Sequence, residues 1–381
     1  MRIQGGTVLA NGQLVETDVD FAEDEGLILA IGTETGNGRC IDASGCIVLP
    51  GIVDIHSDAF ERQLMPRPGV AFPIDIALAE SDRQAISNGI TTIYHGVTWS
   101  WEPGLRGADN ARAILSAIED LRPQLGADTR YHLRHETFNL DAETEVSDWV
   151  AGRRIGMLGF NDHLPGADPT GRTHKLAQRV ERSGLSHQDF IALVDRIKGR
   201  AEEVPESIAR LAAAAAECAV PMLSHDDVSP EQRRWFRNLD CRLSEFPTTV
   251  ETAQEAVRGG DDVVLGAPNV VRGGSHMGWI GAADMIARGC CTILASDYYY
   301  PAPLIASFRL AKEGVASLEQ AWAYVSERPA RAANLNDRGV IEVGRRADLI
   351  LVDASDPIRP QVAATIVNGR LLYLSASGRL Q

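Results

Sequence analysis

The chain has 381 residues, 44% of them hydrophobic and 23% charged, and a formal net charge of −15. This composition supplies a large core, and the acidic balance, with Lys and Arg spread along the chain, argues against nucleic acid or an anionic membrane as a partner. No stretch approaches the ~20 apolar residues of a membrane span and no secretion signal is recognisable, so we expect a soluble, cytoplasmic protein.

The first elements, up to about residue 49, are short β-type runs separated by Gly, Asn and Asp turns. Similar runs return at 348–352 and 364–373, where Asn368-Gly369 predicts a turn. We therefore expect residues 1–49 and 344–381 to form one small β-sheet domain built from both chain ends.

Between these ends, in residues 50–343, β-rich apolar runs alternate with helical patterns. Eight strands are expected, at 52–55, 91–94, 131–133, 155–160, 222–223, 243–246, 263–265 and 292–295. Helices are expected at 111–122, 205–218, 248–258, 281–288 and 317–325. Eight strand-helix units favour an α/β fold that closes into a TIM-like (β/α)8 barrel. An open doubly wound sheet is the alternative, but no Gly-x-Gly-x-x-Gly turn follows the first strand.

Two further features of the sequence concern a long polar segment and the cysteines. Residues 164–187 are polar and too long for an ordinary barrel loop, so they form either a lid or a solvated excursion. The six cysteines lack paired metal-ligand spacing, which favours reduced, buried thiols over disulfides or ligands.

Acidic and imidazole side chains follow most of the predicted strands. His56 and Asp58 stand two residues apart after the first strand, so both point the same way. The third strand ends in Arg-His-Glu (134–136), the fourth in Asn-Asp-His (161–163), the fifth in Ser-His-Asp-Asp (224–227) and the eighth in Ser-Asp-Tyr (296–298). Convergence of such groups at the carboxyl ends of barrel strands is what a hydrolytic metal site needs. We therefore expect the ligands or catalytic groups to include His56, Asp58, His225 and Asp297.

The remaining candidates are less specific. Glu136 is either a ligand or the partner of a nearby arginine, and His163 is a ligand, a substrate contact or a loop histidine. His132, His174 and His187 do not stand at the ends of predicted strands, so we expect their side chains to be solvated or hydrogen-bonded within the protein.

Several strings resemble a known family. VLPGIVDIHSD, ILASD and DRGVIEVGRRADLILVD resemble the amidohydrolase superfamily, whose metal centres lie in such a barrel beside a β domain from both termini. More narrowly, the chain resembles the α-D-ribose 1-methylphosphonate 5-triphosphate diphosphatases, the M component of the carbon-phosphorus lyase pathway, in the ordered strings DIHSDAFERQLMPRPGV, RHE, IKGR, SHDD, EFPTT, GAPNVVRGGSHMG and SDYYYP.

The resemblance implies hydrolysis of this triphosphate to the 5-phosphate and diphosphate by metal-activated water. One or two divalent ions, zinc or manganese, would be held by His56, Asp58, Glu136, His225 and Asp297, with His163 as a further candidate. Asp297 and His225 would be catalytic, Asp297 as ligand or proton acceptor. The chain departs from the superfamily pattern in three places: His-x-Asp replaces His-x-His, no fourth-strand lysine is present, and Glu245 stands where a sixth-strand histidine is expected.

A polyphosphorylated ribose needs phosphate-binding groups, and two segments offer them. One follows the seventh strand and comprises Arg272, Gly273, Gly274, Ser275 and His276. The other is Arg62 with Arg67, just after the first strand, and Tyr298 could form a wall of the sugar site.

The sequence is compatible with three functions. The first hypothesis is the diphosphatase, and the second is another amidohydrolase reaction, such as cyclic amide hydrolysis or deamination. The third, which is not enzymatic, is a metal-free scaffold of a multi-protein complex. The expected partner is a small-molecule substrate, and a homo-oligomer is compatible with the sequence.

Overall fold

The computed structural model describes residues 1–32, 39–67, 69–164, 173–274 and 281–381. Its centre is a parallel sheet of eight strands, β13-β12-β11-β10-β9-β8-β7-β6 in spatial order. The bounds are β6 (Ile52–Ser57), β7 (Ile90–Trp99), β8 (Asp128–Glu136), β9 (Met157–Asn161), β10 (Met222–His225), β11 (Leu243–Glu245), β12 (Asp262–Gly266) and β13 (Ile293–Ala295). A parallel bridge between Ser57 and Asp297 joins the first and last strands, so the sheet is nearly closed. The predicted (β/α)8 barrel is confirmed.

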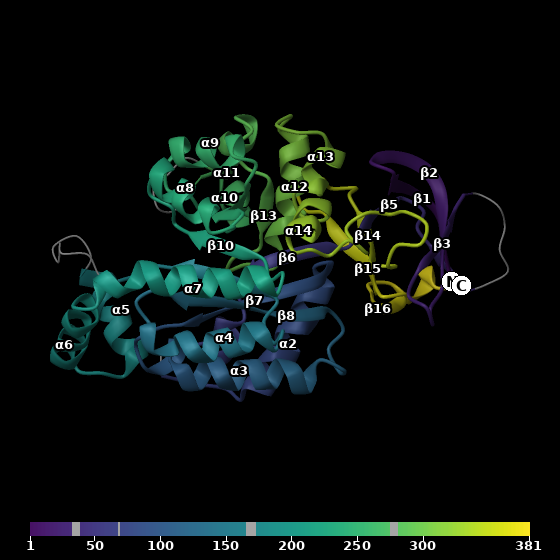
Figure 1. Ribbon diagram of the computed structural model, residues 1–381. Coiled ribbons are helices and arrows are strands. Elements are labelled where there is room, and N and C mark those ends of the chain that lie inside the picture. Colours follow the sequence, from purple (N-terminus) through teal and green to yellow (C-terminus); the bar gives the residue numbers. More distant parts are fainter. Residues whose placement is uncertain (33–38, 68, 165–172, 275–280) are drawn as a thin grey trace.

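Helices surround the barrel (Figure 1). They are α1 (Glu61–Leu64), α2 (Ile74–Ser87), α3 (Ala108–Leu121), α4 (Glu143–Ala151), α5 (Thr173–Ser183), α6 (His187–Lys198), α7 (Val204–Glu217), α8 (Pro230–Asn238), α9 (Val250–Arg258), α10 (Ala267–Arg272), α11 (Ala282–Ala287), α12 (Ala302–Lys312), α13 (Leu318–Ala323) and α14 (Glu327–Ala332). Short 3-10 turns are η1 (Gly104–Arg106), η2 (Leu140–Ala142), η3 (Ala201–Glu203) and η4 (Ser377–Arg379). All five helices expected from the sequence are present.

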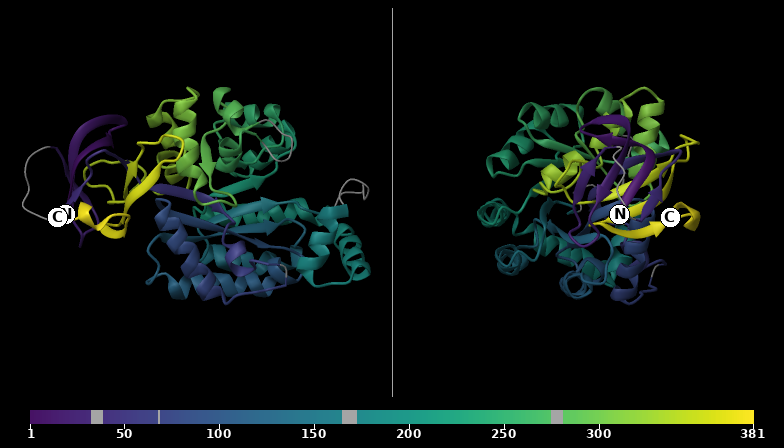
Figure 2. Two further views of the ribbon diagram at one scale, coloured as in Figure 1. Left: turned by 180° about the vertical axis from the view of Figure 1, so that it is seen from behind. Right: turned by 90° about the vertical axis from the view of Figure 1, so that its right-hand side faces the viewer.

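Both chain ends form a second sheet beside the barrel, as predicted. Its strands are β1 (Arg2–Ala10), β2 (Gln13–Phe21), β3 (Ile28–Ile31), β4 (Cys40–Asp42), β5 (Cys46–Pro50), β14 (Leu349–Asp353), β15 (Gln361–Val367) and β16 (Arg370–Leu374). The N-terminal and C-terminal parts meet where β14 pairs antiparallel with β5. Figure 2 shows the two termini side by side in this sheet.

The core explains why the barrel strands read as nearly continuous apolar runs. Every residue of β6 and β7 is buried, because helices cover the outside of the barrel and side chains fill its inside. The interior filling includes Val53, Ile55, Tyr94, Leu223 and Ile293. All six cysteines are free, and four of them are buried.

Different parts of the chain lie at the two ends of the barrel. β5 leads directly into β6, so the terminal sheet lies at the amino ends of the barrel strands, while α5 and α6 follow β9 at the opposite, carboxyl end (Figure 1). Part of the segment 164–187 is thus helical, and the lid alternative stays a prediction.

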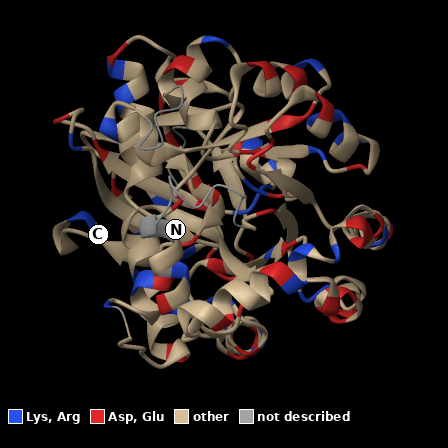
Figure 3. Cartoon of the chain, turned by 90° about the vertical axis from the view of Figure 1, so that its left-hand side faces the viewer, with Lys and Arg blue, Asp and Glu red and all other residues tan. Residues whose placement is uncertain are grey.

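No helix among the described residues is long and apolar enough to cross a membrane. In the view of Figure 3, Lys and Arg are interspersed with Asp and Glu over the described helices.

Candidate metal centre

The first and last barrel strands bring three predicted ligands together. The amide of Asp297 donates to the carbonyl of His56 at 3.0 Å, and the amide of Asp58 donates to the carbonyl of Asp297 at 3.0 Å. These backbone bonds hold the following side chains in register, and potential ligand atoms of His56, Asp58 and Asp297 lie within 4.8 Å of one another. One imidazole and two carboxylates form a donor set suited to a divalent ion.

Asp297 shows why this group suits a cation. Burial and the neighbouring Asp58 carboxylate raise the pKa of Asp297 to about 7. Gly266 keeps this corner tight, because a Cβ there would stand 3.1 Å from Asp297 Oδ2. Two carboxylates held this closely repel each other, and a positive ion between them would remove that cost.

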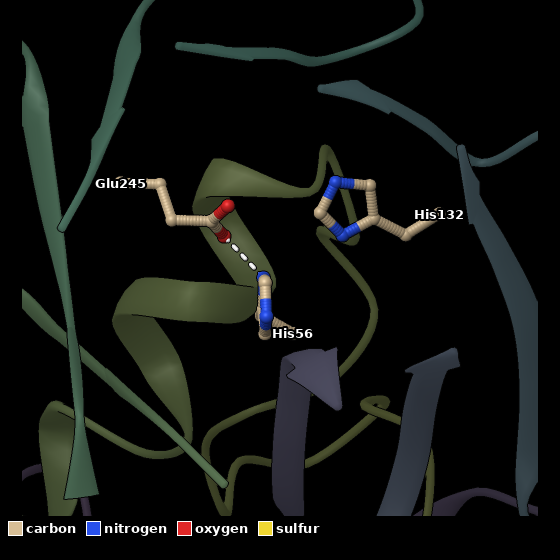
Figure 4. A group of neighbouring side chains, drawn as sticks. All are labelled: His56, His132 and Glu245. Atoms are coloured by element: carbon tan, nitrogen blue, oxygen red, sulfur yellow. Dashed lines mark hydrogen bonds and ion pairs between the residues drawn. The ribbon is translucent and has the colours of Figure 1, made fainter. Parts of the chain in front are cut away.

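A second group lies deeper in the barrel and contains two residues that sequence reasoning did not select (Figure 4). His56 Nδ1 is 2.6 Å from Glu245 Oε1, and both side chains are buried. Burial lowers the pKa of His56, but the Glu245 carboxylate outweighs it and the net shift is upward. With Nδ1 held by Glu245, the Nε2 atom of His56 is left for another partner.

His132 completes this deeper group. Its Nδ1 lies 3.1 Å from the carbonyl of Ile55, which fixes the tautomer with a hydrogen on Nδ1. Its Nε2 is buried without a hydrogen-bond partner among the described residues. Burial lowers the pKa of His132 to about 3, so the ring is neutral and Nε2 carries a free lone pair. The expectation that His132 is a satisfied or solvated histidine is therefore wrong.

The third group comes from the fourth and fifth strands. Potential ligand atoms of His163, His225 and Asp226 lie within 4.8 Å of one another. Glu136 orients His163 from the third strand, since its Oε1 is 2.6 Å from His163 Nδ1 and its Oε2 accepts from the His163 amide at 3.0 Å. Although burial raises the pKa of Glu136, His163 brings it down to about 2. Among the described residues, Glu136 thus makes its hydrogen bonds with His163 and forms no salt bridge with the arginine considered from the sequence.

A buried arginine, also missed from the sequence, connects the groups. Arg134 Nη2 donates to His225 Nε2 at 2.9 Å, and Nη1 lies 3.4 Å from Asp58 Oδ2. The strand alternation contained the signal for this residue, because His132, Arg134 and Glu136 are spaced two apart and face the same side of β8.

The predicted substrate residues gather only in part. Arg62 lies 5.6 Å from the centre of the Tyr298 ring, and Arg272 Nη1 is 3.5 Å from the Tyr298 hydroxyl. Arg67 is exposed in a turn and, within the described residues, makes no hydrogen bond or ion pair with the three groups. Gly273 ends α10 in the left-handed region and Gly274 follows it. Ser275 and His276 lie outside the described residues.

Comparison with known proteins gives consistent matches. A family model described as "Amidohydrolase family" matches residues 74–373. The chain is 32% identical to the α-D-ribose 1-methylphosphonate 5-triphosphate diphosphatase of Escherichia coli K12, over 84% of this chain and 86% of that one. It is 23% identical to a dihydroorotase of Syntrophotalea carbinolica, over 97% and 98%. The L-hydantoinase of Arthrobacter aurescens shares the fold, with a TM-score of 0.65 at 14% identity, over 99% and 96% of the two chains.

Proposed function

Because the chain belongs to the amidohydrolase family, we propose that it hydrolyses α-D-ribose 1-methylphosphonate 5-triphosphate to the 5-phosphate and diphosphate. The observation that carries this proposal is the likeness, along most of the chain, to the Escherichia coli diphosphatase. The donor groups at the strand ends support it, since phosphoryl transfer depends on charge neutralisation and positioning.

The residues present fit a divalent ion. His56, Asp58 and Asp297 would hold one ion, with Glu136, His163, His225 and Asp226 available for a second. A divalent ion, zinc or manganese, supplies Lewis acidity and activates water near neutral pH. Among the described residues, His132 Nε2 and Glu245 Oε2 have no hydrogen-bond partner, so these buried polar atoms are not satisfied by the described residues alone. An abandoned site in a scaffold protein has no physical reason to retain them.

The chain's own residues would then perform distinct tasks. Asp297 would accept the proton of the attacking water, a role open to a carboxylate beside the ion. Arg134, fixed between His225 and Asp58, presents a permanent positive charge to the reacting phosphoryl group. Arg62 and Arg272 flank Tyr298 at the rim and bind phosphate oxygens farther along the chain, while the Tyr298 ring borders the ribose.

The experiment is a phosphorus NMR time course with metal-loaded protein and the triphosphate substrate. We expect the three triphosphate resonances to be replaced by those of a 5-phosphate and free diphosphate. A chelated sample should be inactive and should recover when the ion is restored. Stepwise release of inorganic phosphate, or no hydrolysis by the reloaded protein, would overturn the proposal.

The likeness to a dihydroorotase makes cyclic amide hydrolysis the second candidate. The same protein preparation should be incubated with dihydroorotate and followed by ultraviolet absorbance. Turnover of dihydroorotate together with an unchanged triphosphate spectrum would favour this second candidate over the diphosphatase.

A further inference from the structure

Three arginines gather beside the metal centre at the carboxyl end of the barrel. Arg179 and Arg182 belong to α5, and Arg106 ends the turn η1. The two elements pack backbone to backbone, since a Cβ at Gly104 would lie only 2.2 Å from the carbonyl oxygen of Arg182. Figure 1 shows α5 at the end of the barrel farthest from the terminal sheet. The position of the arginines relative to one another is therefore set by direct packing.

Carboxylates neutralise two of the three guanidinium groups. Arg106 forms a two-pronged contact with Glu61, with Nε 3.2 Å from Oε1 and Nη2 2.9 Å from Oε2. Arg182 Nε donates to Glu102, a carboxylate that is buried. Each of these pairs brings no net charge to the site.

Arg179 differs from its two neighbours. It is half-buried, yet within the described part of the chain it has neither a hydrogen bond nor an ion pair. Burial lowers the pKa of Arg179, and the positive charges of Arg182 and Arg106 lower it further. Glu102 and Glu136 act in the opposite direction, but the net shift of the pKa is downward. A guanidinium held under these conditions is poorly compensated by the protein that surrounds it.

The carboxylates that interact electrostatically with Arg179 make their hydrogen bonds to other residues. Both oxygens of Glu136 contact His163, and Asp162 Oδ1 accepts from the Leu164 amide at 3.1 Å. Glu102 contacts Arg182. Asp162 is close enough to interact electrostatically with Arg179, but no described carboxylate lies within ion-pair distance of the guanidinium, so its N–H groups are left for an external anion.

The location connects this charge to the reaction centre. Arg106 pairs with Glu61, whose amide donates to the carbonyl of Asp58 at 3.0 Å, so the arginine group lies beside a candidate ligand of the metal centre. An anion held by Arg179 would thus adjoin the reacting groups. A guanidinium presents paired N–H donors that match the oxygens of a phosphate.

We propose that Arg179 binds a phosphate group of the substrate, so that α5 provides an oxyanion subsite beside the metal centre. The identity of the ligand as a polyphosphate ester rests on the proposed function. The preference for a tetrahedral oxyanion rests on the unpaired guanidinium itself.

The direct test is isothermal titration calorimetry of inorganic phosphate into metal-loaded protein. Arg179→Ala should weaken the dissociation constant at least tenfold relative to wild type. Arg179→Lys should restore binding only in part, because an ammonium lacks the planar fork. The matched control is Arg196→Ala, an exposed arginine on the neighbouring helix α6, which should bind phosphate as wild type does.

Kinetics and unfolding separate this role from a structural one. With the triphosphate substrate, Arg179→Ala should raise KM at least tenfold and change kcat less. Equal phosphate affinity in wild type and Arg179→Ala would overturn the subsite, above all if the variant had a lowered melting temperature. If wild type released no diphosphate at all, the proposed reaction would fail, while the phosphate affinities would still decide for or against the subsite.

Discussion

His56 and Glu245 are 189 residues apart in the chain, and their side chains meet because β6 and β11 face the same barrel interior. In the sequence, Glu245 stood out only as a missing histidine. Its function as the partner of His56 Nδ1 depends on a contact that no local pattern encodes. Arg134 was missed for a related reason, since an arginine is not a metal ligand and gains meaning only from His225 and Asp58 beside it.

The first prediction concerns Glu245. Glu245→Gln keeps the size of the side chain but removes the charge that holds His56, so the affinity for the metal should fall about 10- to 100-fold. Elemental analysis after dialysis against a weak chelator measures this loss. The control, Glu251→Gln at an exposed position of α9, should retain the wild-type metal content. Equal content in both variants would exclude a role of Glu245 in orienting a ligand.

The second prediction concerns Asp297 in metal-free protein. Its folded pKa of about 7 exceeds the unfolded value of about 3.9, so the folded state binds more protons between these values. The free energy of unfolding should therefore decrease as pH rises from 4 to 7 and change little from this source above pH 7. The loss has an upper limit of about 4 kcal/mol, at about 1.4 kcal/mol for each pKa unit.

Urea unfolding of chelated wild type and Asp297→Asn isolates that contribution. The variant should become more stable than wild type as pH rises towards 7, and the difference should then level off. A stability difference independent of pH would show that Asp297 ionises with an ordinary pKa.

At the scale of elements, the eight barrel strands could be predicted because both of their faces are buried, which leaves an apolar run in the sequence. The three-residue strand β4 is too short to show alternation in the sequence, and its pairing with β1 defines it. The helix α5 was hidden in a polar segment, because only a few of its residues are apolar. The position of Arg179 could therefore not be anticipated.

The third prediction tests the end of α10. Gly273 has φ of 79°, in the left-handed region, and among the described residues a Cβ there would meet only Arg309 Nη2, at 3.5 Å. Gly273→Ala should therefore cost about 1 kcal/mol of unfolding free energy through backbone strain and not through a clash. Gly378→Ala, at a position with open space and an ordinary φ, should be nearly neutral. Equal stabilities in urea titration would contradict the assigned helix end.

At the scale of the whole molecule, the barrel and the terminal sheet are joined by buried polar contacts. Trp322 Nε1 donates to the carbonyl of Pro50 at 2.9 Å, and Thr365 Oγ1 donates to the carbonyl of Ile86 at 2.8 Å. The two-part architecture followed from the similar β-type runs at both chain ends. The boundaries at residues 49/50 and 343/344 stay a prediction, since these contacts cross from one part to the other.

The fourth prediction concerns Arg338, which is buried in this joint. Its Nη1 is 2.6 Å from Asp128 Oδ2 and 2.9 Å from Thr92 Oγ1, and 3.9 Å from Asp348 Oδ2. Arg338→Met should cost about 3 kcal/mol, because the buried Asp348 and the half-buried Asp128 lose a counter-charge. Asp128→Asn in the same chain should recover part of the loss. Arg331→Ala, which removes an exposed cation, should change the unfolding free energy by about 0–1 kcal/mol.

The central claim is that a metal centre at the carboxyl ends of the barrel strands performs the hydrolysis. Anomalous diffraction at the absorption edge of the bound metal, from crystals of protein purified without added metal, tests this claim most directly. We predict an anomalous peak within about 2.0–2.3 Å of ligand atoms of His56, Asp58 and Asp297, with any second peak beside His163 and His225. A peak confined to another part of the molecule, or no peak between His56 and Asp297 in active protein, would contradict the account.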